Sequence, residues 1–385
     1  MSTQYVLKMP HAVYSGENAM ENLSRILMKA MAKKIAVFSD KGIIQAGLLE
    51  TVLSEIRKAE KESVVFDDLA AEPTYKEVQF VVDEFKKSGA DFIIAVGGGS
   101  VMDTAKLASV LLTDDYGVKE LLDCPEMARK CVATLMIPTT AGTGAEATPN
   151  AIVAVPEKEL KVGIVNDAMI ADYVILDAQM IKKLPRKIAA ATGVDALCHA
   201  IECFTSNKGN TFSDMYALQA FEMIMKNIEK ACDDPDAIQE KNNMLIASFY
   251  AGVAITASGT TGVHALSYPL GGKYHIAHGI SNAMLLTPVM KFNEPVCRER
   301  FAMAYDRLMP GEGEKTQEEK SGWLLKKMSD IVKHLNIPES LKEFGVKEED
   351  LETLVMAGME VKRLLVNNMR TITAEDAREI YRQIM

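Results

Sequence analysis

Four of the six histidines and one aspartate lie in two short segments, Asp195–His199 and His264–His278. Residues four apart share one face of a helix, so Asp195 and His199 can bind one ion from the same side. We expect the first segment to be a helix and the second, which contains Gly271 and Gly272, to be a loop. Carboxylate and imidazole together suit a divalent ion such as Fe²⁺ or Zn²⁺, and no Cys-x-x-Cys points to a structural zinc site. The two segments therefore predict a metal site.

The elements that position these segments differ between the two parts of the chain. In the first part, short apolar runs alternate with amphipathic helical patterns, which predicts a parallel, doubly wound (Rossmann-like) sheet. From Arg186 onward the periodicity is helical almost throughout. We therefore expect an α/β nucleotide-binding domain over residues 1–184 and an all-α metal-binding domain over residues 185–385. The expected strands are Lys34–Ser39, Ser63–Phe66, Asp91–Val96 and Val132–Ile137, with further strand-like pieces at Lys161–Val165 and Tyr173–Leu176, and the expected helices are Leu48–Ala59, Lys76–Lys87 and Met102–Leu112.

Two glycine-containing loops follow predicted strands. We call Gly97–Ser100 the glycine loop and Pro138–Glu146 the threonine loop. Backbone N–H groups at such turns can approach a pyrophosphate, and the N-terminus of the following helix adds a favourable dipole. The glycine loop departs from G-x-G-x-x-G because Met102 stands where the third glycine belongs, and alone it is as consistent with a simple tight turn. Two such loops in one sheet favour a dinucleotide.

The acidic residue Asp40 ends a predicted strand. A carboxylate there accepts ribose hydroxyls and repels a 2′-phosphate, which predicts NAD rather than NADP, although an N-cap of the next helix is the alternative. The expected cofactor residues are Asp40, Gly97, Gly98, Gly99, Ser100, Asp103, Thr139, Thr140, Gly142, Thr143 and Lys161.

Length, charge and thiols narrow the class of protein. A chain of 385 residues suits two domains, and a net charge of −10 argues against a nucleic-acid or anionic-membrane surface. No apolar run is long enough to span a membrane and no leader is visible, so we expect a cytoplasmic enzyme acting on a small molecule. The six cysteines follow no framework spacing and are expected to be reduced thiols.

These motifs together resemble the iron-containing, group III alcohol dehydrogenases. The matching segments, in the right order and spread over nearly the whole chain, are Gly97–Asp103, Pro138–Glu146, Ala191–Glu202 and His264–His278. The resemblance implies the dehydroquinate synthase-like architecture, NAD as cofactor, and a homodimer or higher homo-oligomer. It also implies a metal, Fe²⁺ or Zn²⁺, held by four ligands, which are Asp195, His199, His264 and His278.

Two positions depart from the family pattern. Many members carry a histidine that assists proton transfer where this chain has Tyr268, and His275 is the nearest substitute. The candidate proton-handling residues are therefore His275 and Tyr268. The second departure is Glu72, where relatives often place an asparagine near the nicotinamide.

The expected reaction is hydride transfer between a primary or secondary alcohol, or the matching aldehyde or ketone, and NAD(H). Glu202, one turn beyond His199, either orients a metal ligand or forms an ordinary salt bridge. A metal- and NAD-dependent lyase or cyclase of the dehydroquinate synthase type fits the same elements. It would need several basic residues for a polyanionic substrate, and only Lys273 is basic between His264 and His278. A metallohydrolase would leave both loops unexplained.

Overall fold

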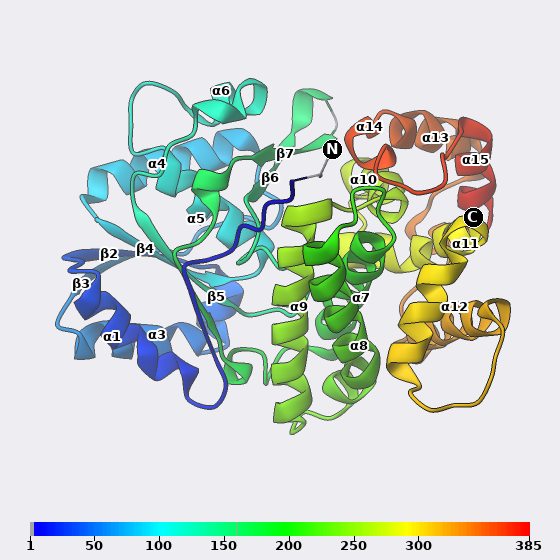
Figure 1. Cartoon of the computed structure of the whole chain (residues 1–385). Helices are drawn as coiled ribbons and strands as arrows, with labels where there is room; N and C mark the ends of the chain where they lie inside the picture. The colour runs from blue at the N-terminus through cyan, green and yellow to red at the C-terminus, as the bar shows by residue number, and fades with distance from the viewer. Residues whose placement is uncertain (1–3, 159) are drawn as a thin grey trace. The chain divides into compact units, whose positions relative to one another are not determined.

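The computed structural model describes residues 4–158 and 160–385, which form two compact units (Figure 1). One unit comprises residues 8–184. The other comprises residues 185–385 together with residues 4–7.

The first unit is built on a six-stranded sheet in which every neighbouring pair is parallel. The strand order is β1-β8-β5-β4-β2-β3. The strands are β1 (Ala12–Ser15), β2 (Lys34–Phe38), β3 (Glu62–Phe66), β4 (Phe92–Gly97), β5 (Ala133–Pro138) and β8 (Tyr173–Leu176). This arrangement confirms the predicted fold class of the N-terminal part.

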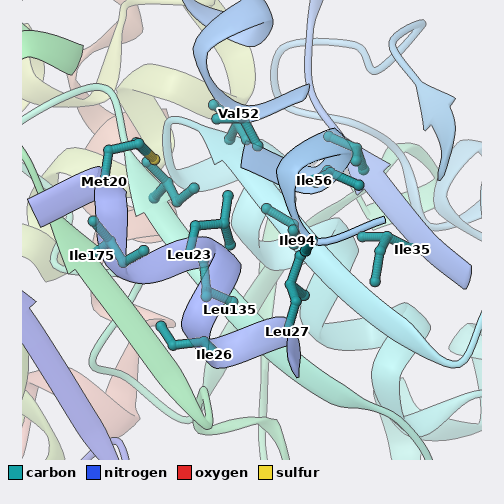
Figure 2. Packing of buried hydrophobic residues seen from close by; sticks show 14 of the residues in the cluster. Met20, Leu23, Ile26, Leu27, Ile35, Val52, Ile56, Ile94, Leu135 and Ile175 are labelled. Atoms are coloured by element: carbon teal, nitrogen blue, oxygen red, sulfur yellow. The ribbon is translucent and has the colours of Figure 1, made fainter. Parts of the chain in front are cut away.

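Helices cover both faces of this sheet. The helices are α1 (Asn22–Lys29), α2 (Lys41–Gln45), α3 (Leu48–Lys58), α4 (Tyr75–Ser88), α5 (Gly99–Val110) and α6 (Val118–Asp123). Figure 2 shows the core on one face, where Leu23 of α1 and Val52 of α3 lie among Ile94, Leu135 and Ile175 of the strands. Successive strand side chains alternate between faces, so the remaining buried strand residues pack on the opposite side, where α5 lies on β4 and β5.

The strand-like piece at Lys161 belongs to a separate hairpin. Strand β6 (Asn150–Val155) pairs antiparallel with β7 (Leu160–Val165) and forms a two-stranded sheet. In β6 buried and half-buried residues alternate, which is the pattern of an antiparallel strand with one covered face. The sequence interpretation did not anticipate β6 or this pairing.

The second unit is all helical, as predicted. Its helices are α7 (Arg186–Phe204), α8 (Thr211–Asp233), α9 (Ile238–Ser258), α10 (Gly262–Tyr274), α11 (His278–Leu308), α12 (Gln317–His334), α13 (Leu351–Met359), α14 (Lys362–Leu365) and α15 (Ala374–Arg382). Within the described residues no single helix is both long and apolar enough to span a membrane. Helices α9 and α10, bent by 105° relative to each other, pass that test as a pair on length and composition alone.

The expected loop from His264 to His278 is mostly helix α10, so that prediction was wrong. Pro269 and the pair Gly271–Gly272 lie inside the helix, although both residue types lower helix propensity. Most residues of α10 are buried, and tertiary packing of this kind outweighs propensity. The only turn between the two histidines is His275–Ala277, after which α11 begins at His278.

Candidate metal centre and nucleotide loops

Three polar side chains occupy one buried face of α7. Asp195, His199 and Glu202 follow a spacing of four and then three residues, which aligns them along the helix, and all three are buried. The rest of α7 is apolar and buried on nearly every side from Ala190 onward, so the helix lies inside the unit. The polar face therefore needs partners from neighbouring helices.

Those partners come from α10 and α11. His264 is buried in the first turn of α10, and His278 begins α11. The next residue, Gly279, lies so close to α7 that a Cβ built on it would be 2.2 Å from the backbone oxygen of Ala191. Only a residue without a side chain lets the start of α11 approach α7 this closely.

Four side chains then converge. We call Oδ1 of Asp195 and the Nε2 atoms of His199, His264 and His278 the ligand cluster. From Asp195 Oδ1, the distances are 3.9 Å to His199 Nε2 and 3.6 Å to Nε2 of both His264 and His278. Ligand atoms of Asp195, His199 and His264 also lie within 4.8 Å of one another. Two ligands of a tetrahedral ion, each about 2.1 Å from it, lie about 3.4 Å apart, so the cluster has the dimensions of a divalent metal site.

Glu202 sets the orientation of His264. One carboxylate oxygen, Oε2, accepts a hydrogen bond from Nδ1 of His264, while Oε1 accepts from the backbone N–H of Val263 at 2.7 Å and from that of Thr261 at 3.0 Å. This bond keeps a proton on Nδ1, so that in the neutral imidazole the lone pair of Nε2 faces the cluster. Of the two alternatives for Glu202, this geometry favours the orientation of a histidine over an ordinary salt bridge.

The charges around the cluster are strongly coupled. Burial alone would lower the pKa of His264, but the carboxylates of Glu202 and Asp195 outweigh it and raise the pKa to about 9. Burial would likewise raise the pKa of Asp195, yet the three histidines hold it well below its usual range. A buried carboxylate with three imidazoles is an O/N donor set that suits Fe²⁺ or Zn²⁺, and the residues therefore fit a metal.

The two candidate proton-handling residues lie in different surroundings. The ring of Tyr268 is 6.0 Å from that of His278, between centroids, and its hydroxyl accepts a hydrogen bond from Arg363 at 3.4 Å. Burial raises the pKa of Tyr268. His275 is exposed and ends α10 in the left-handed conformation, with φ of 54°, and Ile276 N–H then bonds to the carbonyl of Leu270.

One residue in contact with the ligand cluster was missed by sequence reasoning. Asn282 lies one turn after His278 on α11, is completely buried, and donates a hydrogen bond to Asp195 Oδ1 at 2.7 Å. The spacing of four from a predicted ligand was a usable signal, because residues four apart share a helix face.

In the first unit, the glycine and threonine loops meet at one edge of the sheet. In the sheet, β3 lies on one side of β2, whereas β4 and then β5 lie on its other side. The direction in which strands are added therefore reverses between β2 and β4. Ligands of open α/β sheets bind beyond the carboxyl ends of strands at such a point. The backbone N–H of Thr139 bonds to Gly97 O at 3.0 Å, and a Cβ on Gly99 would be 3.0 Å from Thr143 Cγ2. The loops thus form a compact backbone cradle of the kind that accommodates a pyrophosphate.

The other predicted cofactor residues have identifiable partners. Asp40 caps α2 by accepting from Ile43 N–H at 3.0 Å. Asp103 is buried, where it accepts from Ile152 N–H at 3.0 Å and lies 3.5 Å from Lys106 Nζ. These contacts give Asp103 a structural task, which is to attach α5 to β6.

The remaining candidates lie at or next to the glycine loop. Glu72, at a positive φ of 58°, donates its backbone N–H to Ser100 Oγ at 3.2 Å, and its carboxylate pairs with Lys161 Nζ at 2.5 Å. Thr140 packs on the same loop, 3.8 Å from where a Cβ of Gly98 would lie, and Gly142 is part of the threonine loop. The structure therefore brings Lys161 to the loops predicted to hold a nucleotide.

Comparison with known proteins covers both units. Residues 10–178 match the family described as iron-containing alcohol dehydrogenase, and residues 189–385 match the C-terminal domain of the Fe-containing alcohol dehydrogenase family. The chain belongs to the iron-containing alcohol dehydrogenase family. Long-chain-alcohol dehydrogenase 1 of Geobacillus thermodenitrificans is 33% identical over 375 residues, which is 97% of this chain and 94% of that protein. The NAD-dependent methanol dehydrogenase of Bacillus methanolicus is 30% identical over 98% of both chains.

Solved structures of the iron-containing alcohol dehydrogenase family share the whole fold. A 1,3-propanediol oxidoreductase superposes with a TM-score of 0.93 at 26% identity and covers 100% of both chains. An alcohol dehydrogenase from Oenococcus oeni superposes with a TM-score of 0.92 at 27% identity over 99% of this chain and 100% of that one. The protein is therefore an alcohol dehydrogenase or aldehyde reductase, and the lyase and metallohydrolase alternatives are not supported.

Proposed function

We propose that this protein transfers hydride between a primary or secondary alcohol and NAD(H), with one divalent ion held by Asp195, His199, His264 and His278. The observation that carries the proposal is the convergence of three imidazole nitrogens on a single buried carboxylate oxygen, at 3.6 to 3.9 Å. When bound, the ion supplies Lewis acidity to an alcohol or carbonyl oxygen, and the nicotinamide ring supplies the hydride chemistry.

The ligand residues divide their tasks. Asp195 brings one negative charge to a site of three neutral imidazoles, which lowers the cost of burying a divalent cation. Glu202 keeps the proton of His264 on Nδ1 and so keeps Nε2 available. The same carboxylate is anchored by Thr261 and Val263, so it cannot turn away from the imidazole without losing those hydrogen bonds.

The dinucleotide is proposed to lie on the glycine and threonine loops of the first unit. Support comes from their position at the reversal of strand order and from the N-terminus of α5, which begins at Gly99. Asp40 follows β2 at the same reversal and carries a carboxylate that disfavours a 2′-phosphate, so we propose NAD rather than NADP. Lys161 is the cation that we propose for contact with the cofactor, in exchange for or in addition to its pairing with Glu72.

For proton transfer, the two sequence candidates remain Tyr268 and His275. Tyr268 is the one whose ring lies beside a metal-ligand candidate. We further propose a cytoplasmic homodimer or higher homo-oligomer, in keeping with the family resemblance, and sedimentation analysis of the purified protein tests the oligomeric part.

The proposed function is tested by removing the metal and restoring it. Protein stripped with a chelator should produce no NADH from a panel of primary and secondary alcohols, and Fe²⁺ or Zn²⁺ added under anaerobic conditions should restore NADH production. His264→Ala and His278→Ala should bind no stoichiometric metal and lose turnover by several orders of magnitude, because Lewis-acid stabilisation contributes several kcal/mol. Exposed His334→Ala is the matched control and should behave as the parent. Full activity of metal-free His278→Ala would refute the proposal.

A further inference from the structure

The side-chain nitrogen of Asn282 lies within hydrogen-bond distance of several atoms of the ligand cluster. Its Nδ2 lies 2.7 Å from Asp195 Oδ1, 3.1 Å from His264 Nε2 and 3.1 Å from His278 Nε2. One amide nitrogen on α11 therefore contacts three of the four candidate ligand atoms, which come from three different helices.

The atoms that Asn282 contacts differ in how many partners each can bind at once. An imidazole nitrogen has at most one lone pair, whereas a carboxylate oxygen has two. Asp195 Oδ1 can accordingly accept the hydrogen bond from Asn282 and bind an ion at the same time. The histidines cannot do both, so an ion replaces their contacts with Asn282 and leaves the bond to Asp195 in place.

In the described part of the chain, the amide oxygen of Asn282, in contrast to its nitrogen, lacks a hydrogen-bond partner. Asn282 is 0% exposed, and its Oδ1 has no hydrogen-bond partner among the residues that the structure describes. A buried acceptor without a partner is unfavourable, and such groups are rare in folded proteins. The side chain is therefore held by its nitrogen end alone, toward the ligand cluster.

We propose that Asn282 is a positioning residue of the metal centre. Its amide nitrogen donates to Asp195 Oδ1 and fixes that carboxylate beside the histidines, so that this ligand oxygen is already in place when an ion binds. The inference rests on the proposed function, since it takes the ligand cluster to be the metal site. Partners that orient metal ligands in this way typically contribute about 10- to 100-fold in metal affinity.

The test compares two buried asparagines of the same helix. Asn282→Leu keeps the branched shape of the side chain, although it is bulkier, and removes the donor. The control is Asn293→Leu, because Asn293 is also 0% exposed on α11 but exchanges its hydrogen bonds with Asn368. Zn²⁺ affinity of each chelator-stripped full-length variant is measured by competition with a chromogenic chelator, and the thermal stability of the metal-free protein is measured in parallel.

We expect Asn282→Leu to weaken Zn²⁺ binding about 10- to 100-fold and to change the visible absorption of the Co²⁺-saturated protein, while Asn293→Leu lowers stability and leaves both metal readouts unchanged. If Asn282→Leu does not fold, Asn282→Ala serves for the same comparison. Equal Zn²⁺ affinity of the parent and the Asn282 variant would overturn the inference alone, and so would a loss of affinity that simply follows the loss of stability in both variants. A parent protein that binds no stoichiometric Zn²⁺ would overturn the proposed metal centre as well.

Discussion

Replacing Glu202 by glutamine should disable His264 as a ligand while leaving the fold intact. Oε1 of Glu202 accepts hydrogen bonds from four donors, which are Thr261 Oγ1 at 2.8 Å and the backbone N–H groups of Thr261 at 3.0 Å, Val263 at 2.7 Å and His264 at 3.4 Å. Only the oxygen of the new amide can satisfy these donors, so its NH₂ must face His264 Nδ1. An NH₂ donates, which forces the imidazole proton onto Nε2, where it blocks metal binding.

The size of the effect follows from the contacts. A lost orienting partner weakens metal binding about 10- to 100-fold, which equals about 1.4 to 2.7 kcal/mol. The metal-free variant keeps the four bonds to the amide oxygen, and the pKa of His264 falls because the Glu202 carboxylate, which together with Asp195 raises it to about 9, is gone. The buried donors stay satisfied, so we expect the free energy of unfolding to fall by only about 1 kcal/mol.

The assay combines metal affinity with the tautomer itself. Nitrogen NMR of ¹⁵N-histidine-labelled, metal-free protein distinguishes protonated Nδ1 from protonated Nε2 when it is recorded above the His264 pKa of about 9, and chelator competition gives the Zn²⁺ affinity. Glu202→Ala is the comparison, because it leaves the Thr261 and Val263 donors without a buried acceptor and should destabilise the protein far more. Parent-like metal affinity in Glu202→Gln, with His264 still protonated on Nδ1, would refute the reasoning.

Five further substitutions test other parts of the structure. Asp40→Asn keeps the cap of α2 but removes the charge, so the ratio of kcat/KM for NAD to that for NADP should fall; an unchanged ratio would leave Asp40 as a cap only. Gly279→Ala should lower both Tm and metal affinity, because its Cβ would collide with the backbone of α7. Burial raises the pKa of Glu146 from 4.5 to about 7, so the folded state holds its proton more tightly and stability falls as pH rises through that interval. Glu146→Gln should remove this slope and add about 3 kcal/mol at pH 8 in urea unfolding, and a parent-like slope would contradict the assignment. His275→Gly should gain about 0.5 to 1 kcal/mol by relieving the positive φ and keep its turnover, while Tyr268→Phe alters the pH–rate profile; a 100-fold rate loss in His275→Gly would instead place the proton path at His275.

Much of the nucleotide-binding unit was predictable because its signals are local. The buried strands at Lys34, Asp91 and Val132 are continuous apolar runs, and the structure places β2, β4 and β5 within one residue of the expected bounds. Strands β1 and β6 escaped notice because they are four and six residues long and only partly buried. Their identity depends on pairing with β8 and β7, which no local pattern encodes.

In the candidate metal centre, too, the features with a local sequence signal were predicted and those that depend on packing were not. The structure places Asp195 and His199 on one face of α7, as the helical spacing predicted. The helix between His264 and His278 was mistaken for a loop, because its glycines and proline oppose helix formation locally. Asn282 carries no charge and lies in an apolar stretch, so only the approach of α11 to α7 shows its contact with Asp195. The left-handed turn at His275 likewise follows from how α10 ends, a conformation that histidine adopts only with some strain.

The most direct test of the proposed metal centre is anomalous X-ray diffraction from crystals of the enzyme reconstituted with Fe²⁺ or Zn²⁺. We predict one ion per chain, at about 2.0 to 2.2 Å from the ligand atoms of Asp195 and the three histidines. NADH production should be proportional to the occupancy of that ion. A fully active, metal-loaded enzyme whose anomalous peak lies away from these four residues would contradict this prediction.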